Sequence, residues 1–352
     1  MKVTCPGSLK VLCLVVCAVW ASSTAIAESA DPFYKGKTIK VLVSSSPGGG
    51  TDTVARLVSR FLPKYLPGNP ETYVQNMPAG GGLVANNYFY RVSKPDGLTL
   101  FGTSSGPMTI YNRGGAKVKY NPREYSWLGS LSRGGSVLMV RKDAKSRLLD
   151  PKAEPVVIGD REGNRTWLSM TLWGKEALGW NTRYVIGYAG TAEMVLAVRQ
   201  GEIELWSSGN AEIVKGLKKD GMVEFIAQQG SERRRDFPNV PTYEEFLGNK
   251  RPTGVSWQAY RVWSGPAEVD KPLAAPAGTP KYIVAILREA YQKMVKDRDF
   301  IKQANKFLGE AWLTRGGEQT SAMVKQSTEM SKEVRDFLYN IRKKNGLPTR
   351  GS

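Results

Sequence analysis

A strand, a glycine turn and the start of a helix follow one another in IKVLVSSSPGGGTDTVARL, residues 39–57. The strand covers Ile39–Val43, and the glycines of the turn are Gly48, Gly49 and Gly50. Backbone N–H groups at such a junction can converge on a negative group, and the helix dipole adds partial positive charge there. The stretch therefore predicts an anion pocket at the carboxyl end of the first strand.

Histidine is absent from the 352 residues. The chain therefore lacks the usual general base at neutral pH, the commonest metal ligand and any Ser-His-Asp arrangement. This composition favours binding over catalysis, and we expect neither a metal nor an organic cofactor.

Residues 1–27 have the pattern of a secretory signal peptide. Lys2 and Lys10 precede an apolar stretch, Val11–Trp20, and the segment ends in small residues up to Ala27. We expect cleavage before Glu28 and export to the periplasm. The three cysteines all lie in this leader, so no disulfide is expected in the mature chain; they are Cys5, Cys13 and Cys17.

The chain is strongly basic, with a formal net charge of +18 that falls to +16 when Lys2 and Lys10 leave with the leader. A basic surface is compatible with nucleic acid, a membrane surface or a small anion. Acidic residues interleave with the bases over Lys281–Lys344, which is typical of a solvated helical face. Nucleic acid is therefore not an expected partner, and no mature segment has the ~18 apolar residues of a membrane span.

Strands and helices alternate along the mature chain, which predicts an α/β architecture. Polar or glycine-rich loops follow the strands expected at Ile39–Val43, Thr72–Gln75 and Leu98–Gly102. Further strands are expected at Val137–Val140, Val156–Gly159, Tyr184–Tyr188, Gly201–Trp206 and Val223–Ala227. The C-terminal third is expected to be helical, with a helix capped at Thr279 and further helices over Phe300–Leu308 and Glu318–Arg342.

This order predicts two lobes. Residues 28–126 and 255–352 form the expected first lobe, and residues 127–254 form the second. The chain is expected to cross between them near Trp127–Arg133 and Val255–Val262, and these segments would serve as the hinge.

Seven motifs follow one another along the chain: PGGGTD at Pro47–Asp52, NMPAGGG at Asn76–Gly82, PDG at Pro95–Gly97, GYAGTAEM at Gly187–Met194, GEIEL at Gly201–Leu205, FPNVPTYEE at Phe237–Glu245 and APAGTPKYIV at Ala275–Val284. In these motifs and their order, the chain resembles the periplasmic solute receptors of tripartite tricarboxylate transporters, the Bug-type extracytoplasmic receptors. The resemblance implies a type II periplasmic binding-protein fold. It also implies a monomeric receptor that closes over a small organic carboxylate and presents it to membrane permease subunits.

The resemblance also implies which residues hold the ligand. A carboxylate would be bound largely by backbone amides of the first two loops, which here are Gly48, Gly49, Gly50, Thr51 and Asp52, followed by Pro78, Ala79, Gly80 and Gly81. From the residues themselves we also expect contributions from Ser45 in the first loop, from Trp206 at the end of a strand, and from the later loops through Ser104, Ser105, Gly163, Asn164, Arg165, Thr166, Gly190 and Thr191.

The chain departs from the family pattern at two loops. Ala79 stands where the family commonly has a glycine, and Gly163–Thr166 replaces a loop that often carries Ser and His. The identity of the ligand is therefore not carried over. Arg165 is either a partner of a second carboxylate or a solvated arginine, and Trp206 either stacks on a ligand or packs in the core. Asp52 would cap the helix, hold a water, or meet an amine or hydroxyl of the ligand.

Three enzyme patterns compete with the receptor. Gly102–Gly106 fits the G-x-S-x-G elbow of serine hydrolases, but no histidine is available to activate Ser104. Gly80–Ala85 fits a relaxed dinucleotide fingerprint, but no acidic residue follows at the required spacing. Gly36–Thr38 is similar to part of a phosphate loop, yet Asp31 replaces its leading glycine. A sensor that presents the ligand to a signalling protein stays an alternative to transport.

Overall fold

The computed structural model describes residues 1–2, 33–161, 163 and 165–349. The predicted signal peptide, apart from its first two residues, and the candidate Asn164 lie outside the described residues. Within the described part, none of the helices is both long and apolar enough to cross a membrane.

The first of two sheets has six strands in the order β11-β4-β10-β3-β1-β2. They are β1 (Thr38–Val43), β2 (Glu71–Asn76), β3 (Thr99–Gly102), β4 (Ser126–Ser132), β10 (Lys271–Ala275) and β11 (Leu313–Gly316). β1 pairs in parallel with β2 and β3, and β10 runs antiparallel to β3 and β4. The last three residues of β1 are buried, as expected for a central strand covered on both faces.

The second sheet has five strands in the order β7-β6-β8-β5-β9. They are β5 (Val137–Arg141), β6 (Val156–Asp160), β7 (Thr182–Ile186), β8 (Leu205–Ser208) and β9 (Val223–Gln228). β6 pairs in parallel with β7 and β8, and β5 is antiparallel to β8 and β9. At one edge, each sheet therefore has three parallel strands, which are β2, β1 and β3 in the first and β7, β6 and β8 in the second. An antiparallel strand lies next to the third of these, β10 beside β3 and β5 beside β8.

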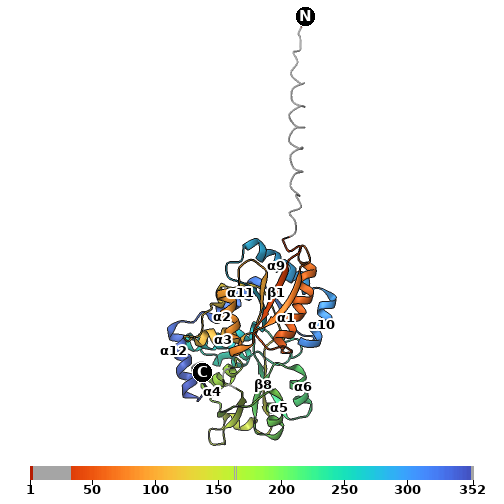
Figure 1. Ribbon diagram of the computed structural model, residues 1–352. Helices are drawn as coiled ribbons and strands as arrows, with labels where there is room; N and C mark the ends of the chain where they lie inside the picture. Colours follow the sequence, from red (N-terminus) through yellow and green to blue (C-terminus); the bar gives the residue numbers. More distant parts are fainter. Residues whose placement is uncertain (3–32, 162, 164, 350–352) are drawn as a thin grey trace.

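Helices cover both sheets. The first sheet carries α1 (Gly50–Phe61), α2 (Leu83–Val92), α3 (Gly106–Arg113), α9 (Lys281–Met294), α10 (Arg298–Leu308) and α11 (Gly317–Thr328). The second carries α4 (Leu168–Leu178), α5 (Thr191–Gln200), α6 (Ala211–Lys219), α7 (Tyr243–Leu247), α8 (Gly254–Ser264) and α12 (Lys332–Lys344). We call these two bodies the first lobe and the second lobe; they are the upper and lower bodies of Figure 1. The α/β prediction is confirmed.

Each lobe has its own apolar core. Phe61, Leu287 and Phe300 are among the buried side chains of the first lobe. Trp173 of α4 is fully buried in the second lobe, with ring centroids 5.5 Å from Tyr260 and 6.4 Å from Trp263 of α8. Because no single core spans both sheets, relative motion of the lobes would leave each core intact.

The chain passes between the lobes three times, at residues 133–136, at 265–270 and at 329–331. The sequence placed the first crossing at Trp127–Arg133. The structure corrects this, because β4 pairs with β10 and β11 in the first sheet as far as Ser132.

The structure also corrects the expected division of the C-terminal third. α8 and α12, assigned from the sequence to the first lobe, contribute Tyr260, Val334 and Ile341 to the core of the second. The single helix expected over Glu318–Arg342 is broken in two, because Ser331 accepts a hydrogen bond from the amide of Val334 (3.2 Å) and caps α12.

Candidate ligand-binding site

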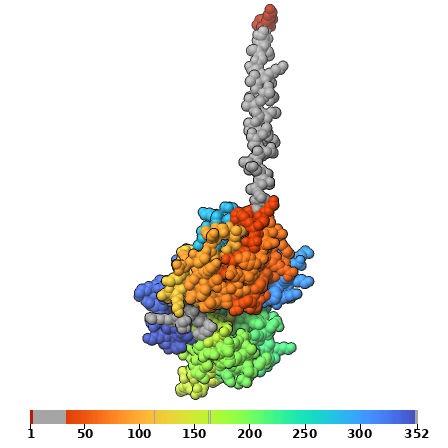
Figure 2. Space-filling model, viewed as in Figure 1, coloured from red at the N-terminus to blue at the C-terminus, as the bar shows by residue number. Residues whose placement is uncertain are grey.

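A cleft of about 890 Å³ lies between the lobes, and it falls within the ~300–1,000 Å³ range of small-molecule sites. Figure 2 shows the first lobe, in red to orange, above the second, in green. The first lobe and the crossings supply Gly80, Gly81, Ser105, Gly106, Thr109, Ile110, Arg133, Gly134, Gly135, Ser136, Ala267 and Asp270. The second lobe supplies Arg165, Thr166, Trp167, Thr191, Ser208, Gly209, Asn210, Gln229 and Pro348.

Six of the residues predicted from the sequence line this cleft together: Gly80, Gly81, Ser105, Arg165, Thr166 and Thr191. Gly80 and Gly81 have φ values of +65° and +62°, a conformation that side chains rarely adopt, so the second loop depends on glycine there. The departure at Ala79 has no such cost, since Asn69 is the only described non-glycine residue with a positive φ.

The residues of the first glycine turn do not line the cleft, and the side chain of Asp52 binds the backbone of this turn. Asp52 is almost fully buried, and its carboxylate accepts hydrogen bonds from the Gly48 amide (2.9 Å), Arg56 Nε (2.9 Å) and Asn76 Nδ2 (2.8 Å). Burial alone would raise the pKa of Asp52, but these hydrogen bonds outweigh it and hold the pKa below its usual value. Asp52 therefore ties the glycine turn and β2 to α1, and it does not cap the helix as expected, because the N-cap of α1 is Gly49 and has no side-chain cap.

Two loops of the second lobe are closed in a similar way. The fully buried Asp160 accepts a hydrogen bond from the Gly163 amide (2.8 Å), and Glu193 accepts one from the Ala189 amide (2.5 Å). The Gly163 amide is one that the sequence analysis assigned to a ligand, and Ala189 directly precedes the predicted Gly190.

The other predicted residues do not line the cleft. Those in neighbouring loop positions are Ser45, Gly48, Gly49, Gly50, Thr51, Asp52, Pro78, Ala79, Ser104, Gly163 and Gly190. Trp206 lies in β8 opposite Met139 and is 3 % exposed, which makes it part of the second-lobe core. The strand reaches the cleft only at its last residue, Ser208.

Positive charge gathers where α1 begins. A Cβ placed on Gly50 would lie 3.8 Å from Lys271 Cε and 3.9 Å from Arg133 Nη2. Asp270 forms ion pairs with both cations, with 3.8 Å between its Oδ2 and Arg133 Nε. Burial would raise the pKa of Asp270, but the charges of Lys271 and Arg133 outweigh it and lower the pKa below its usual value. With Asp52 and its partner Arg56 included, three cations and two carboxylates leave one net positive charge beside the N-terminus of α1.

Arg165 brings a second guanidinium to the cleft from the opposite lobe. Its Nε lies 3.3 Å from Asp160 Oδ1, and its side chain is 38 % exposed. Arg165 therefore lines the cleft and is paired with the buried Asp160. The sequence analysis had left two roles open for it, a partner of a ligand carboxylate or a solvated arginine, and neither included this ion pair.

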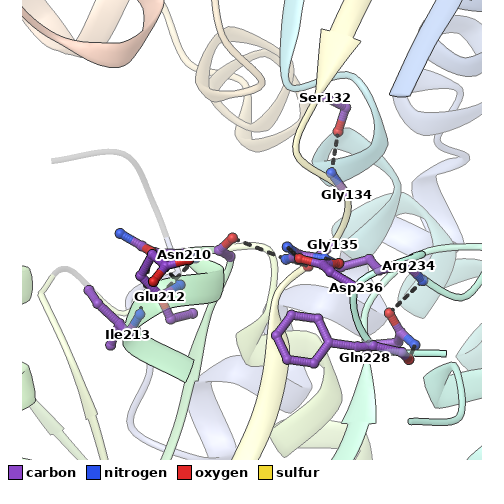
Figure 3. A network of polar contacts seen from close by, with 12 residues as sticks. Ser132, Gly134, Gly135, Asn210, Glu212, Ile213, Gln228, Arg234 and Asp236 are labelled. Atoms are coloured by element: carbon purple, nitrogen blue, oxygen red, sulfur yellow. Dashed lines mark hydrogen bonds and ion pairs between the residues drawn. The ribbon is translucent and has the colours of Figure 1, made fainter. Parts of the chain in front are cut away.

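A buried arginine fixes two walls of the cleft. Arg234 Nη1 donates to the carbonyl oxygens of Gly135 (2.9 Å) and Gly209 (3.0 Å), and its Nε and Nη2 donate to Asp236 (2.9 and 2.7 Å). Figure 3 shows this network, in which the Arg234 amide also donates to Gln228 Oε1 (2.8 Å). Arg234 thus ties the first crossing to the loop after β8.

The sequence analysis missed part of the site. The residues it did not identify include Arg133, Ser208, Asn210, Gln229, Arg234 and Asp270. Arg133 carried a usable signal, because it precedes two glycines between two strands. Arg234 carried none, since it stands in the run Arg233–Arg235 and differs from its neighbours only by being buried.

The site offers hydrogen-bond donors and positive charge but no evident catalytic pair. Ser104 Oγ accepts a hydrogen bond from the Gly106 amide (3.3 Å), and the chain has no histidine to activate it. Among residues 33–161, 163 and 165–349, no three acidic side chains gather as a metal site would require.

Comparisons with known proteins agree with this geometry. No family model matches the chain. It is 27% identical to a UPF0065 protein of Agrobacterium vitis over 77% of this chain and 75% of that protein. It is 24% identical to the protein BugT of Bordetella pertussis over 82% of this chain and 86% of that protein.

Solved structures share the two-lobe fold. A TctC solute-binding protein from Polaromonas matches with a TM-score of 0.66 and 22% identity, over 88% of this chain and 99% of that one. MatC from Rhodopseudomonas palustris, solved with bound malate, matches with a TM-score of 0.52 and 20% identity, over 83% and 97%. An R. palustris protein solved with adipate matches with a TM-score of 0.57 and 18% identity, over 89% and 98%. The chain is thus similar in sequence to BugT and to UPF0065 proteins, and it shares its fold with the TctC protein from Polaromonas and with the periplasmic binding protein BugD.

Proposed function

We propose that this protein is a periplasmic solute-binding receptor that takes a small organic carboxylate into the cleft and delivers it to a tripartite membrane transporter. The observation that carries the proposal is that Arg133 and Arg165 both line the cleft, with Lys271 and the N-terminus of α1 next to Arg133. A hydrogen bond to a charged carboxylate contributes about 1.5–3 kcal/mol, whereas a helix terminus adds about 0.3–1 kcal/mol. Direct hydrogen bonds would therefore dominate the affinity.

A dicarboxylate fits the distribution of charge better than a monocarboxylate. Arg133 stands at the first lobe and Arg165 at the second, and both line the cleft. A ligand with an anionic group at each end would satisfy both guanidinium groups. Malate and adipate, present in two structures of the same fold, are dicarboxylates.

Such a ligand would favour closure, because it would contact both lobes only when they approach each other. A ligand that binds the closed state more tightly shifts the population towards that state. The residue 133–136 crossing joins the lobes and lines the cleft, so it is the proposed hinge.

Titration calorimetry tests the proposal. Mature chain is titrated with dicarboxylates, tricarboxylates, monocarboxylates and amino acids, and at least one dicarboxylate is expected to bind. Arg165→Ala should weaken dicarboxylate binding about tenfold or more while changing monocarboxylate binding little, since a charge-assisted pair is lost only from the former. Arg199→Ala is the control, because Arg199 forms an exposed ion pair with Asp220 away from the cleft.

Absence of binding by every acid, together with hydrolysis of esters, would reverse the assignment in favour of Ser104. Equal losses of both acid classes in Arg165→Ala would refute its role at a second carboxylate. Uptake of the labelled acid by cells that carry the permease separates transport from sensing. Tight binding without any dependence of uptake on the protein would favour the sensor.

A further inference from the structure

The loop that carries Arg165 is anchored at Gly163, two residues before the arginine. The Gly163 amide donates to Asp160 Oδ2 (2.8 Å), and the other oxygen of this buried carboxylate lies 3.3 Å from Arg165 Nε. The carbonyl oxygen of Gly163 accepts a hydrogen bond from Nη2 of Arg342 (3.1 Å), which stands 179 positions further along the chain. Gly163 is therefore held from two elements, by its amide to β6 and by its carbonyl to α12.

Arg342 is itself held firmly. It stands in the last turn of α12 and is 6 % exposed, although charged side chains are rarely buried without partners. Its guanidinium lies 4.6 Å from the centroid of the Trp263 ring of α8, a distance at which a cation and an aromatic face attract each other. Val334 and Ile341 fix α12 in the core of the second lobe. The group that donates to Gly163 is thus part of a packed element.

The chain that follows α12 reaches the same glycine. Leu347 is 3 % exposed in the second-lobe core, and its amide donates to the carbonyl oxygen of Arg342 (2.9 Å). A Cβ placed on Gly163 would lie 2.7 Å from Cδ of the next residue, Pro348. The segment Arg342–Pro348 therefore meets Gly163 both by a hydrogen bond and by close packing.

We propose that Arg342 is a positioning residue for Arg165: by holding Gly163, it keeps the Arg165 guanidinium in the cleft before a solute arrives. The inference rests on the proposed carboxylate site, in which Arg165 pairs with a second carboxylate. The Arg165 side chain is 38 % exposed, so on a loosened loop it would have to be ordered during binding, which reduces affinity. The preference for a dicarboxylate then depends on Arg342, although Arg342 does not line the cleft.

Calorimetry tests the proposal with succinate and adipate, each compared with the monocarboxylate of equal chain length, butyrate or hexanoate. Arg342→Met keeps much of the side-chain volume but removes the donor to Gly163. It should weaken the dicarboxylates about three- to tenfold, the loss expected when one long side chain must be ordered on binding, and change the monocarboxylates less than about twofold. Arg335→Met is the matched control, because Arg335 is exposed on the same helix and lies outside the cleft; it should change nothing.

A double-mutant cycle separates this role from a general effect on the fold. Arg165→Ala removes the side chain that Arg342 positions, so adding Arg342→Met should weaken the dicarboxylates less than about twofold further, whereas independent residues would multiply their losses. Should Arg342→Met fail to fold, Arg342→Lys is measured in the same cycle. It keeps the charge but lacks the planar guanidinium that joins Gly163 to the Trp263 ring, so the same selective loss is expected.

The outcomes separate this inference from the proposed function. A selective loss of dicarboxylate binding that vanishes in the Arg165→Ala background supports it. Unchanged dicarboxylate binding, equal losses for both classes of acid, or losses that multiply in the double variant would overturn it and leave the carboxylate cleft standing. If neither dicarboxylate binds the wild-type chain and the wider panel also fails, the proposed function is wrong and the positioning role falls with it.

Discussion

At the scale of single residues, the loops of this protein are partly closed by the protein's own carboxylates. Asp52, Asp160 and Glu193 each accept a hydrogen bond from an amide in a loop that the sequence marked as a ligand site. These bonds hold the loops in shape before any ligand arrives. In the proposed receptor, the affinity for a solute would depend on the charged groups that still line the cleft, chiefly Arg133 and Arg165.

Asp52 makes the stability of the first lobe depend on pH. Its pKa is lowered in the folded state, so the unfolded chain takes up the proton first as the pH falls. The stabilisation is therefore complete above about pH 4 and is lost below it. Asp52→Asn should lower the free energy of unfolding by about 1–3 kcal/mol at pH 7 and by much less at pH 3. Urea denaturation at both pH values measures this.

Asp220→Asn is the control for this substitution, because Asp220 pairs with Arg199 at an exposed position. It should change stability by less than about 1 kcal/mol at either pH. An equal loss for Asp52→Asn at pH 7 and pH 3 would contradict the assigned role of its carboxylate.

Several residues that line the cleft could be predicted from the sequence, and the residues that were missed share one cause. Gly80, Gly81 and Thr191 were found because strand ends and glycine loops are local patterns. Arg234 was missed because its role depends on burial against Gly135 and Gly209, which are about 100 and 25 positions away. Contacts at such separations leave no local mark on the sequence.

At the scale of elements, the first crossing is the most constrained part of the cleft. A Cβ placed on Gly135 would lie 1.6 Å from the carbonyl oxygen of Gln229, and Gln229 in turn donates its amide to Ser136 O (2.8 Å). The backbone of the crossing therefore packs directly against the backbone that follows β9, and only glycine at position 135 permits this approach.

Gly135→Ala should push the crossing away from β9. We expect a loss of about 1–3 kcal/mol of stability, as for other overpacked sites, and a weaker affinity for the solute. Thermal unfolding and calorimetry measure the two effects. Gly216→Ala, in a helix where a Cβ meets no atom within 4 Å, should instead be neutral or slightly stabilising. Unchanged stability and binding in Gly135→Ala would contradict the close approach.

The elements that were hard to predict break local rules. β10 was missed because Pro272 sits inside a central strand, where proline is normally excluded; its carbonyl oxygen still accepts from the Thr103 amide (3.1 Å), and the pairing with β4 has an irregularity at Leu273–Ala274. β1, β5, β6 and β9 were predicted within one or two residues, because apolar and β-branched residues predominate in each.

At the scale of the whole molecule, two similar sheets with separate cores are joined by three crossings. The sequence indicated two lobes but assigned the segments of α8 and α12 to the wrong one, because an apolar helix face can pack on either lobe. Their packing is decided by the surface that each helix meets in the folded molecule.

Closure can be followed by fluorescence energy transfer, because the only cysteines lie in the predicted leader. Dyes on Val92→Cys of α2 and Leu196→Cys of α5, both exposed and in different lobes, should approach when a bound acid closes the cleft. The control pair, Val92→Cys and Phe307→Cys of α10, lies within the first lobe and should show no change. Constant transfer in the first pair at saturating acid would argue against closure.

The place of Pro348 has a practical consequence. It lines the cleft, and a Cβ on Gly163 would lie 2.7 Å from its Cδ, so this proline packs on the loop that carries Arg165. A bulky group attached at Pro348 would therefore begin at the wall of the cleft. The same position would suit a biosensor, since a fluorophore anchored there would sit beside a bound solute.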